Sequence, residues 1–184
     1  MTDWTVRGIT RALLPVLLVL TALELVSGLA LESFEATLLA YPSLLVLVPA
    51  VIGTAGNLGS VLSARLATAF HLGLLAFDPG DERLVGNAAT TVLLALTVFP
   101  VVGVGAWAVT WATGRARLSP WTVLAVAVTS GLALAVLAVV VTVVAAYGAY
   151  RLELDPDDVV IPTVTNVCDV LGVVVLLVVS QLLV

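Results

Sequence analysis

The sequence predicts an all-α integral membrane protein with five transmembrane helices. Hydrophobic residues make up 61% of the 184 positions, charged residues make up only 10%, and the mean hydropathy is +1.22. Soluble domains carry about 25% charged residues, so a sizeable aqueous domain is not expected. The apolar stretches are also too long and too evenly spread to belong to a cleaved signal peptide.

Five apolar stretches each provide the roughly 20 residues that a helix needs to cross a bilayer. We expect the spans, to within a few residues, at 11–31, 42–70, 84–111, 120–149 and 160–184. No internal repeat or linker divides the chain. The whole of residues 1–184 is therefore predicted to form one five-span transmembrane domain.

The first two spans carry the first polar features. Glu24 lies in the middle of the first span. It could be a cation ligand or a proton site, but a structural hydrogen bond to another helix is the favoured interpretation. Pro42, Pro49 and several glycines make the second span long and irregular. Backbone groups freed by a kink or break must face protein or water instead of lipid.

Small residues follow one stripe of the second span at three- and four-residue spacings. Such a stripe lets two helices approach closely, so packing is favoured over pore lining, although Asn57 adds an amide that could bond across helices or ligate a cation. The stripe consists of Gly53, Gly56, Asn57, Ser60, Ala64 and Ala67. The third and fourth spans are mostly apolar and carry no comparable constellation.

The fifth span places an acid deep in the bilayer. Asp169 lies about ten residues inside it, or about 15 Å at the helical rise, near the midplane of a hydrocarbon core about 30 Å thick. A carboxylate there costs about 2.5–3.5 kcal/mol on insertion scales, so an ion-binding role is the default interpretation and a structural acid is the alternative. Thr165 and Gly172 share its helix face, and Asn166 flanks that face.

The arginines predict the orientation of the chain. There is no lysine, and four of the seven arginines fall at the N-terminus, the second loop and the fourth loop, against two in the third loop. The positive-inside rule then favours a cytoplasmic N-terminus and an external C-terminus in the cell membrane. With a net charge of −5, a basic surface for nucleic acid is excluded as a main feature.

Two segments resemble the MgtE-type magnesium transporters and channels. IGTAGNLGS at 52–60 is similar to the GxGGNxGxQ segment of that family's second membrane helix. DPDDVVIPTVTNVCDVLG at 155–172 resembles the DPAxxxxPxVTTxxDxxG segment that opens its fifth. The number of spans and the order of the motifs also fit. Val61 departs from the family's glutamine, and Ala55 departs from a glycine.

The resemblance implies an MgtE-like membrane domain that forms a homodimer, with a pore between the second and fifth helices of two subunits. The pore aspartate falls on Asp169, the acid at the cytoplasmic approach on Asp155, and the conserved asparagine of the second helix on Asn57. Gly56 and Gly59 flank that asparagine. Mg²⁺ is the expected transported ion, and no cofactor is expected.

The sequence leaves two rival functions open and disfavours catalysis. Asp169 and Glu24 could serve a proton- or sodium-coupled transporter, or the chain could be an accessory subunit that pairs with a homologous half in a heterodimer. A single histidine, His71, rules out an HExxH motif and makes a tight transition-metal site unlikely. No GxxxxGK[ST] motif is present, so we expect the protein not to be an enzyme.

Overall fold

The computed structural model is an all-helical bundle, and the prediction of five membrane-spanning helices is confirmed. Residues 5–74, 80–152 and 154–184 are described. The helices are α1 (Val6–Glu32), α2 (Glu35–Ala40), α3 (Pro42–His71), α4 (Glu82–Ala112), α5 (Pro120–Arg151) and α6 (Pro156–Leu183). All except α2 are long and apolar enough to cross a membrane.

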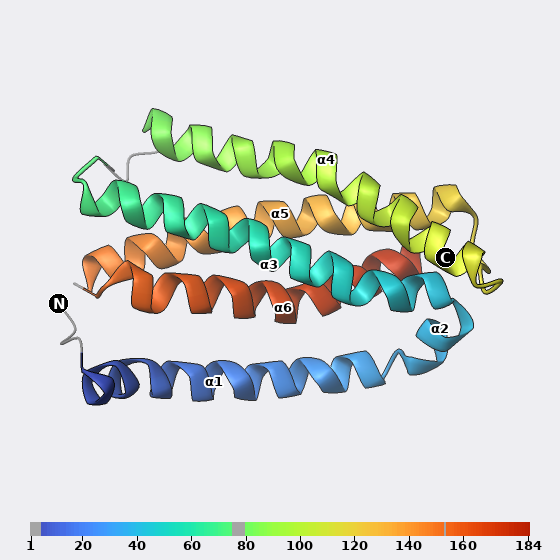
Figure 1. Ribbon diagram of the computed structural model, residues 1–184, viewed down its shortest axis with the longest axis horizontal. Helices are drawn as coiled ribbons and strands as arrows, with labels where there is room; N and C mark the ends of the chain where they lie inside the picture. The colour runs from blue at the N-terminus through green and yellow to red at the C-terminus, as the bar shows by residue number, and fades with distance from the viewer. Residues whose placement is uncertain (1–4, 75–79, 153) are drawn as a thin grey trace.

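The helices match the predicted spans but extend beyond them. α1 begins at Val6, where Thr5 accepts a hydrogen bond from the backbone of Gly8, as an N-cap residue does. α3 is one continuous helix with Pro49 inside it, so of the predicted kink, tilt or partial break, the break does not occur. The short helix α2, which the hydropathy pattern did not indicate, joins α1 to α3 at one end of the bundle (Figure 1).

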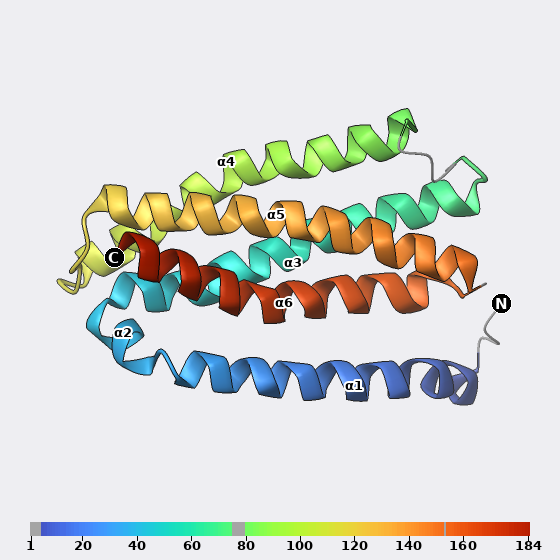
Figure 2. The ribbon, with the colours of Figure 1, turned by 180° about the vertical axis from the view of Figure 1, so that it is seen from behind.

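Consecutive long helices run antiparallel to one another, and the five are not equally enclosed. α6 lies against α1, α3 and α5, whereas α4 lies against α3 and α5 on the far side of the bundle (Figure 2). α1 lies along the opposite edge, where α6 is its main contact. Most of the α1 side chains are exposed. The two ends of the chain lie at opposite ends of the bundle, as an odd number of spans requires.

In the core between α4 and α5, Phe99 of α4 packs directly against Gly131 of α5. Phe99 is fully buried, and a Cβ atom built on Gly131 would lie only 2.0 Å from a carbon of the Phe99 ring. Only glycine leaves room for the ring at this point. The contact between Phe99 and Gly131 therefore fixes how α5 lies against α4. It also supports the side of α3 that faces these two helices.

Candidate functional site

α3 and α6 approach each other closely along a line of glycines. A Cβ atom on Gly59 would lie 2.6 Å from Cγ1 of Val164, and one on Gly172 would lie 2.9 Å from Cγ1 of Ile52. Both distances are shorter than real side chains allow. The glycines from the two motifs thus set the spacing between α3 and α6.

The Asp169 carboxylate lies in this contact, near the middle of α6. The Cβ position of Gly56 is 3.6 Å from Oδ1 of Asp169 and 3.5 Å from Cγ2 of Thr165. Asp169 is half-buried, while Gly56 is buried. Without a side chain at position 56, the carboxylate can lie against the backbone surface of α3.

A hydroxyl pair lies one turn from the carboxylate. Oγ of Ser60 and Oγ1 of Thr165 are 2.9 Å apart, and each hydroxyl also lies 2.9 Å from a carbonyl oxygen of its own helix, at Gly56 and Ile161 respectively. Two hydroxyl hydrogens cannot fill three such contacts at once. Each hydroxyl oxygen has two lone pairs and accepts at most one hydrogen bond in this set, so each keeps a lone pair that it can offer a cation.

The small-residue stripe of α3 divides between two faces. Gly56 and Gly59 are buried, whereas Gly53 and Asn57 are exposed. Gly53 has open space around its Cβ position. Val61, which is neither small nor polar, is 53% exposed on the outer side of α3. The interpretation as a single packing or pore-lining stripe is therefore too simple, because α3 presents one glycine face to α6 and a second, polar face to its surroundings.

Asn166 contacts α1. Its Nδ2 donates a hydrogen bond to Oε1 of Glu24 on α1. The Asn166 side chain is buried, and its Oδ1 has no hydrogen-bond partner within the described residues. Glu24 also lies near enough to Asp169 for the two carboxylates to repel each other. Helical periodicity predicted the helix face of Asn166 but could not show that α1 is the helix it contacts.

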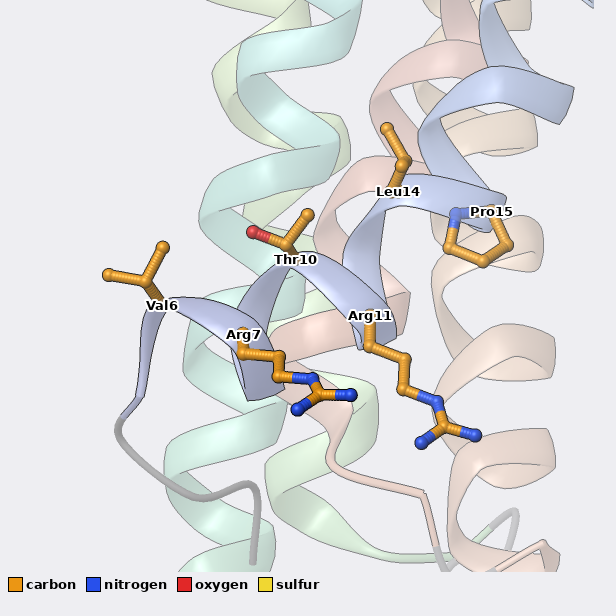
Figure 3. A pocket seen from close by; sticks show the side chains of 6 residues that line it. All are labelled: Val6, Arg7, Thr10, Arg11, Leu14 and Pro15. Atoms are coloured by element: carbon orange, nitrogen blue, oxygen red, sulfur yellow. The ribbon is translucent and has the colours of Figure 1, made fainter.

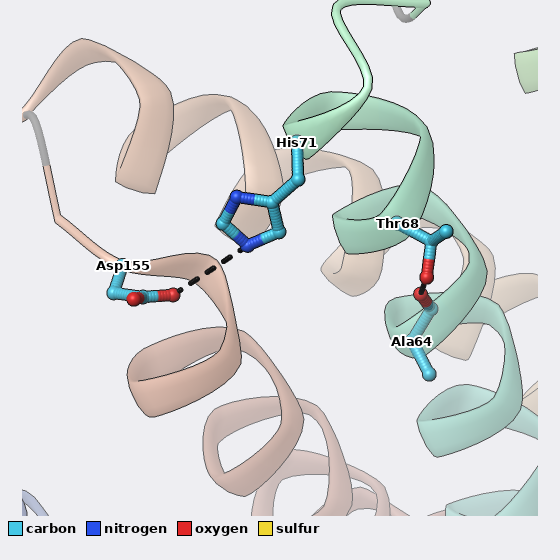
Figure 4. Close-up of polar contacts among 4 residues, drawn as sticks. All are labelled: Ala64, Thr68, His71 and Asp155. Carbon is cyan, nitrogen blue, oxygen red and sulfur yellow. Dashed lines mark hydrogen bonds and ion pairs between the residues drawn. The ribbon is translucent and has the colours of Figure 1, made fainter. Parts of the chain in front are cut away.

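Asp155 lies far from this cluster, at the end of the bundle where α6 begins. Its Oδ1 is 3.8 Å from Nε2 of His71, the last residue of α3 (Figure 4). Both side chains are partly exposed. The pair joins the ends of the same two helices that meet around Asp169. The sequence did not reveal that His71 would lie beside Asp155.

The central cluster has the composition of a weak, hydrated cation site. Within the described residues, no three side chains of His, Cys, Asp and Glu gather to hold a metal ion. Any cation beside Asp169 would take its other ligands from at most one further carboxylate and from hydroxyl groups, amides and water. Magnesium is commonly bound in this way, by one or two carboxylates with retained waters.

Comparison with protein families finds one match for these helices. The MgtE family model, described as a divalent cation transporter, matches residues 48–179. The matched segment runs from the first turns of α3 nearly to the end of α6 and includes the whole contact around Asp169. A search of curated proteins finds no match.

The Ser60–Thr165 contact should appear as a small coupling energy. In a double-mutant cycle, Ser60→Ala and Thr165→Val should couple by about 0.6 kcal/mol, the usual value for hydrogen bonds between membrane helices. Reversible unfolding in detergent micelles measures it. Among the described residues, the Ser180 hydroxyl bonds to the carbonyl of Leu177 within α6, so Ser60→Ala with Ser180→Ala should be additive. Equal coupling in both pairs would contradict a direct bond between α3 and α6.

Proposed function

Because the chain belongs to the MgtE family of divalent cation transporters, we propose that it moves Mg²⁺ through a pore lined by α3 and α6 of two subunits. The observation that supports this proposal most strongly is the position of Asp169. Its carboxylate lies at mid-span against the side-chain-free surface of Gly56. Ionisable groups inside a membrane characteristically mark ion pathways.

The chemistry of the cluster suits an ion that keeps part of its water. Mg²⁺ dehydrates reluctantly and prefers oxygen ligands. The Asp169 carboxylate offers charge, while the hydroxyls of Ser60 and Thr165 offer neutral oxygens one turn away. Two copies of Asp169 across a dimer axis would match the charge of one divalent ion.

A second copy of the chain is the partner that the outer face of α3 favours. Asn57 is exposed at mid-helix, and an amide that faces lipid has no partner to replace water. Gly53, one turn away, leaves room for a neighbouring backbone. A two-fold dimer through this face would cover the amide and bring Asn57 toward the ion path. Two-fold dimers are the commonest symmetric oligomers.

The membrane potential suffices to drive this transport. Each elementary charge gains about 2.3 kcal/mol per 100 mV, and a divalent ion gains about twice that. A second candidate function is exchange coupled to protons or sodium. The approach of Glu24 to Asp169 favours it, because two repelling carboxylates can share a counter-ion.

Replacing Asp169 tests the proposed function. Asp169→Asn keeps the size of the side chain but removes its charge from both subunits. Uptake of Mg²⁺ into liposomes should fall at least about a hundredfold, because each 1.4 kcal/mol of lost attraction is tenfold. Asp169→Glu should retain part of the activity with altered ion selectivity.

The matched control for this experiment is Glu32→Gln, which removes a carboxylate from the end of α1. It should transport at the wild-type rate. Uptake by Asp169→Asn at the wild-type rate across the pH range would return Asp169 to a structural role. A variant that loses only the pH dependence and the accumulation of the ion would favour the coupled exchanger instead.

We orient the chain with its N-terminus in the cytoplasm. Arg7 and Arg11 project on the same side of α1, where they line a surface pocket with Val6, Thr10, Leu14 and Pro15 (Figure 3). Arg83 and Arg151 lie at the same end of the bundle, whereas Arg115 and Arg117 lie at the other. This excess of arginine at one end supports a cytoplasmic location.

Cysteine labelling in intact cells tests this orientation. In a Cys168→Ala background, an impermeant reagent applied outside should label Val184→Cys and spare Leu154→Cys, because Leu154 lies at the arginine-rich end. Permeabilised cells provide the control for accessibility. The reverse pattern would invert the topology.

Disulfide crosslinking tests the dimer. In the same background, Val61→Cys lies on the exposed face of α3 and should form a covalent dimer on oxidation. Val144→Cys, which is also exposed but lies on α5, should not. A crosslink at position 144 alone would assign the interface to α5. Crosslinking of Val61→Cys only when a homologous chain is co-expressed would favour the heterodimer.

A further inference from the structure

We propose that each subunit holds a divalent cation between α1 and α6, bound by the carboxylates of Glu24 and Asp169 and by the amide oxygen of Asn166. The proposal rests on the proposed function, because it adds a ligand to the Asp169 site. It also goes beyond that function. Glu24 lies outside residues 48–179, so the family match assigns it no role.

The contact between α1 and α6 supplies the geometry. Nδ2 of Asn166 bonds to Oε1 of Glu24, and Asp169 lies three residues further along α6, on a neighbouring part of the helix surface. Glu24 is close enough to Asp169 for their charges to interact. Glu24 and Asn166 therefore meet between α1 and α6, and the charge of Asp169 acts on the same contact.

The Asn166 amide is the second observation that points to a ligand. The side chain is only 6% exposed, and Oδ1 accepts no hydrogen bond from any described residue. A buried polar atom without a partner costs about 1–3 kcal/mol. Nδ2 of the same amide bonds to Glu24, so the unpartnered oxygen belongs to a side chain in the contact between α1 and α6. A cation bound there would satisfy the oxygen.

The two carboxylates also lack a positive partner. Among the described residues, no arginine forms an ion pair with Glu24 or Asp169. Glu24 is exposed at mid-helix on α1, where an uncompensated charge is costly. Two negative charges balance one divalent ion, and carboxylate and amide oxygens with retained waters are ordinary ligands for Mg²⁺.

Manganese binding tests this site, because Mn²⁺ replaces Mg²⁺ at oxygen sites and is observed directly by electron paramagnetic resonance. Glu24→Gln keeps the size of the side chain and can still bond to the Asn166 amide. Removing a group that only supports a metal ligand by hydrogen bonding weakens metal binding by about 10–100-fold. Removing a ligand itself should therefore raise the Kd of the purified protein for Mn²⁺ at least about tenfold. The melting temperature should stay unchanged.

Two further variants separate ligation from a structural link. Asn166→Leu removes the amide oxygen but leaves both carboxylates, so it should also weaken Mn²⁺ binding. It keeps the proposal testable should Glu24→Gln fail to fold. Glu32→Gln removes a carboxylate from the same helix away from the cluster, so its Kd should equal that of the wild type.

The outcomes for this site and for the proposed function can be told apart. Wild-type affinity in both Glu24→Gln and Asn166→Leu, with transport still abolished by Asp169→Asn, would overturn the α1 site and leave the pore intact. A lower melting temperature with unchanged affinity would make the Glu24–Asn166 contact a structural link only. Absence of both Mn²⁺ binding and Mg²⁺ uptake in the wild type would overturn both proposals.

Discussion

A carboxylate in the middle of a bilayer must be surrounded by groups that replace water, and the arrangement of the helices meets this constraint around Asp169. Gly56 opens a surface on α3 against which the carboxylate lies. The hydroxyls of Ser60 and Thr165 add polarity one turn away, and α1 contributes Glu24 from the other side. The close approach of α3 to α6 at Gly59 makes the first two of these contacts possible.

Much of this arrangement could be predicted because membrane helices leave few choices. Length and hydropathy identified the five spans, and the cost of a buried acid singled out Asp169. The periodicity of a helix also placed Thr165 and Gly172 on the face of Asp169, and both lie along α3 in the structure. Each of these inferences uses one helix at a time, where local geometry determines the answer.

The rest of the arrangement depends on which helices contact one another. The sequence of a single helix does not contain that information. Residues three or four apart share a face, yet Gly56 lies against α6 while Asn57, the next residue, is exposed. Asn166 was assigned to the flank of the ion-binding face, but the sequence could not identify α1 as the helix that it contacts. Asp155 was expected at the approach to the pore, but its partner His71 could be identified only once the ends of α3 and α6 were seen together.

The contact of Phe99 with Gly131 distinguishes α4 and α5, which are held together, from α1, which is not held in this way. A ring packed against a helix backbone resists both sliding and rotation of that helix, so we expect α4 and α5 to act as one rigid unit. α1 has no such anchor and meets the bundle mainly through α6. We therefore expect any change in the spacing of the helices around Asp169 to involve α1 more than α4 or α5.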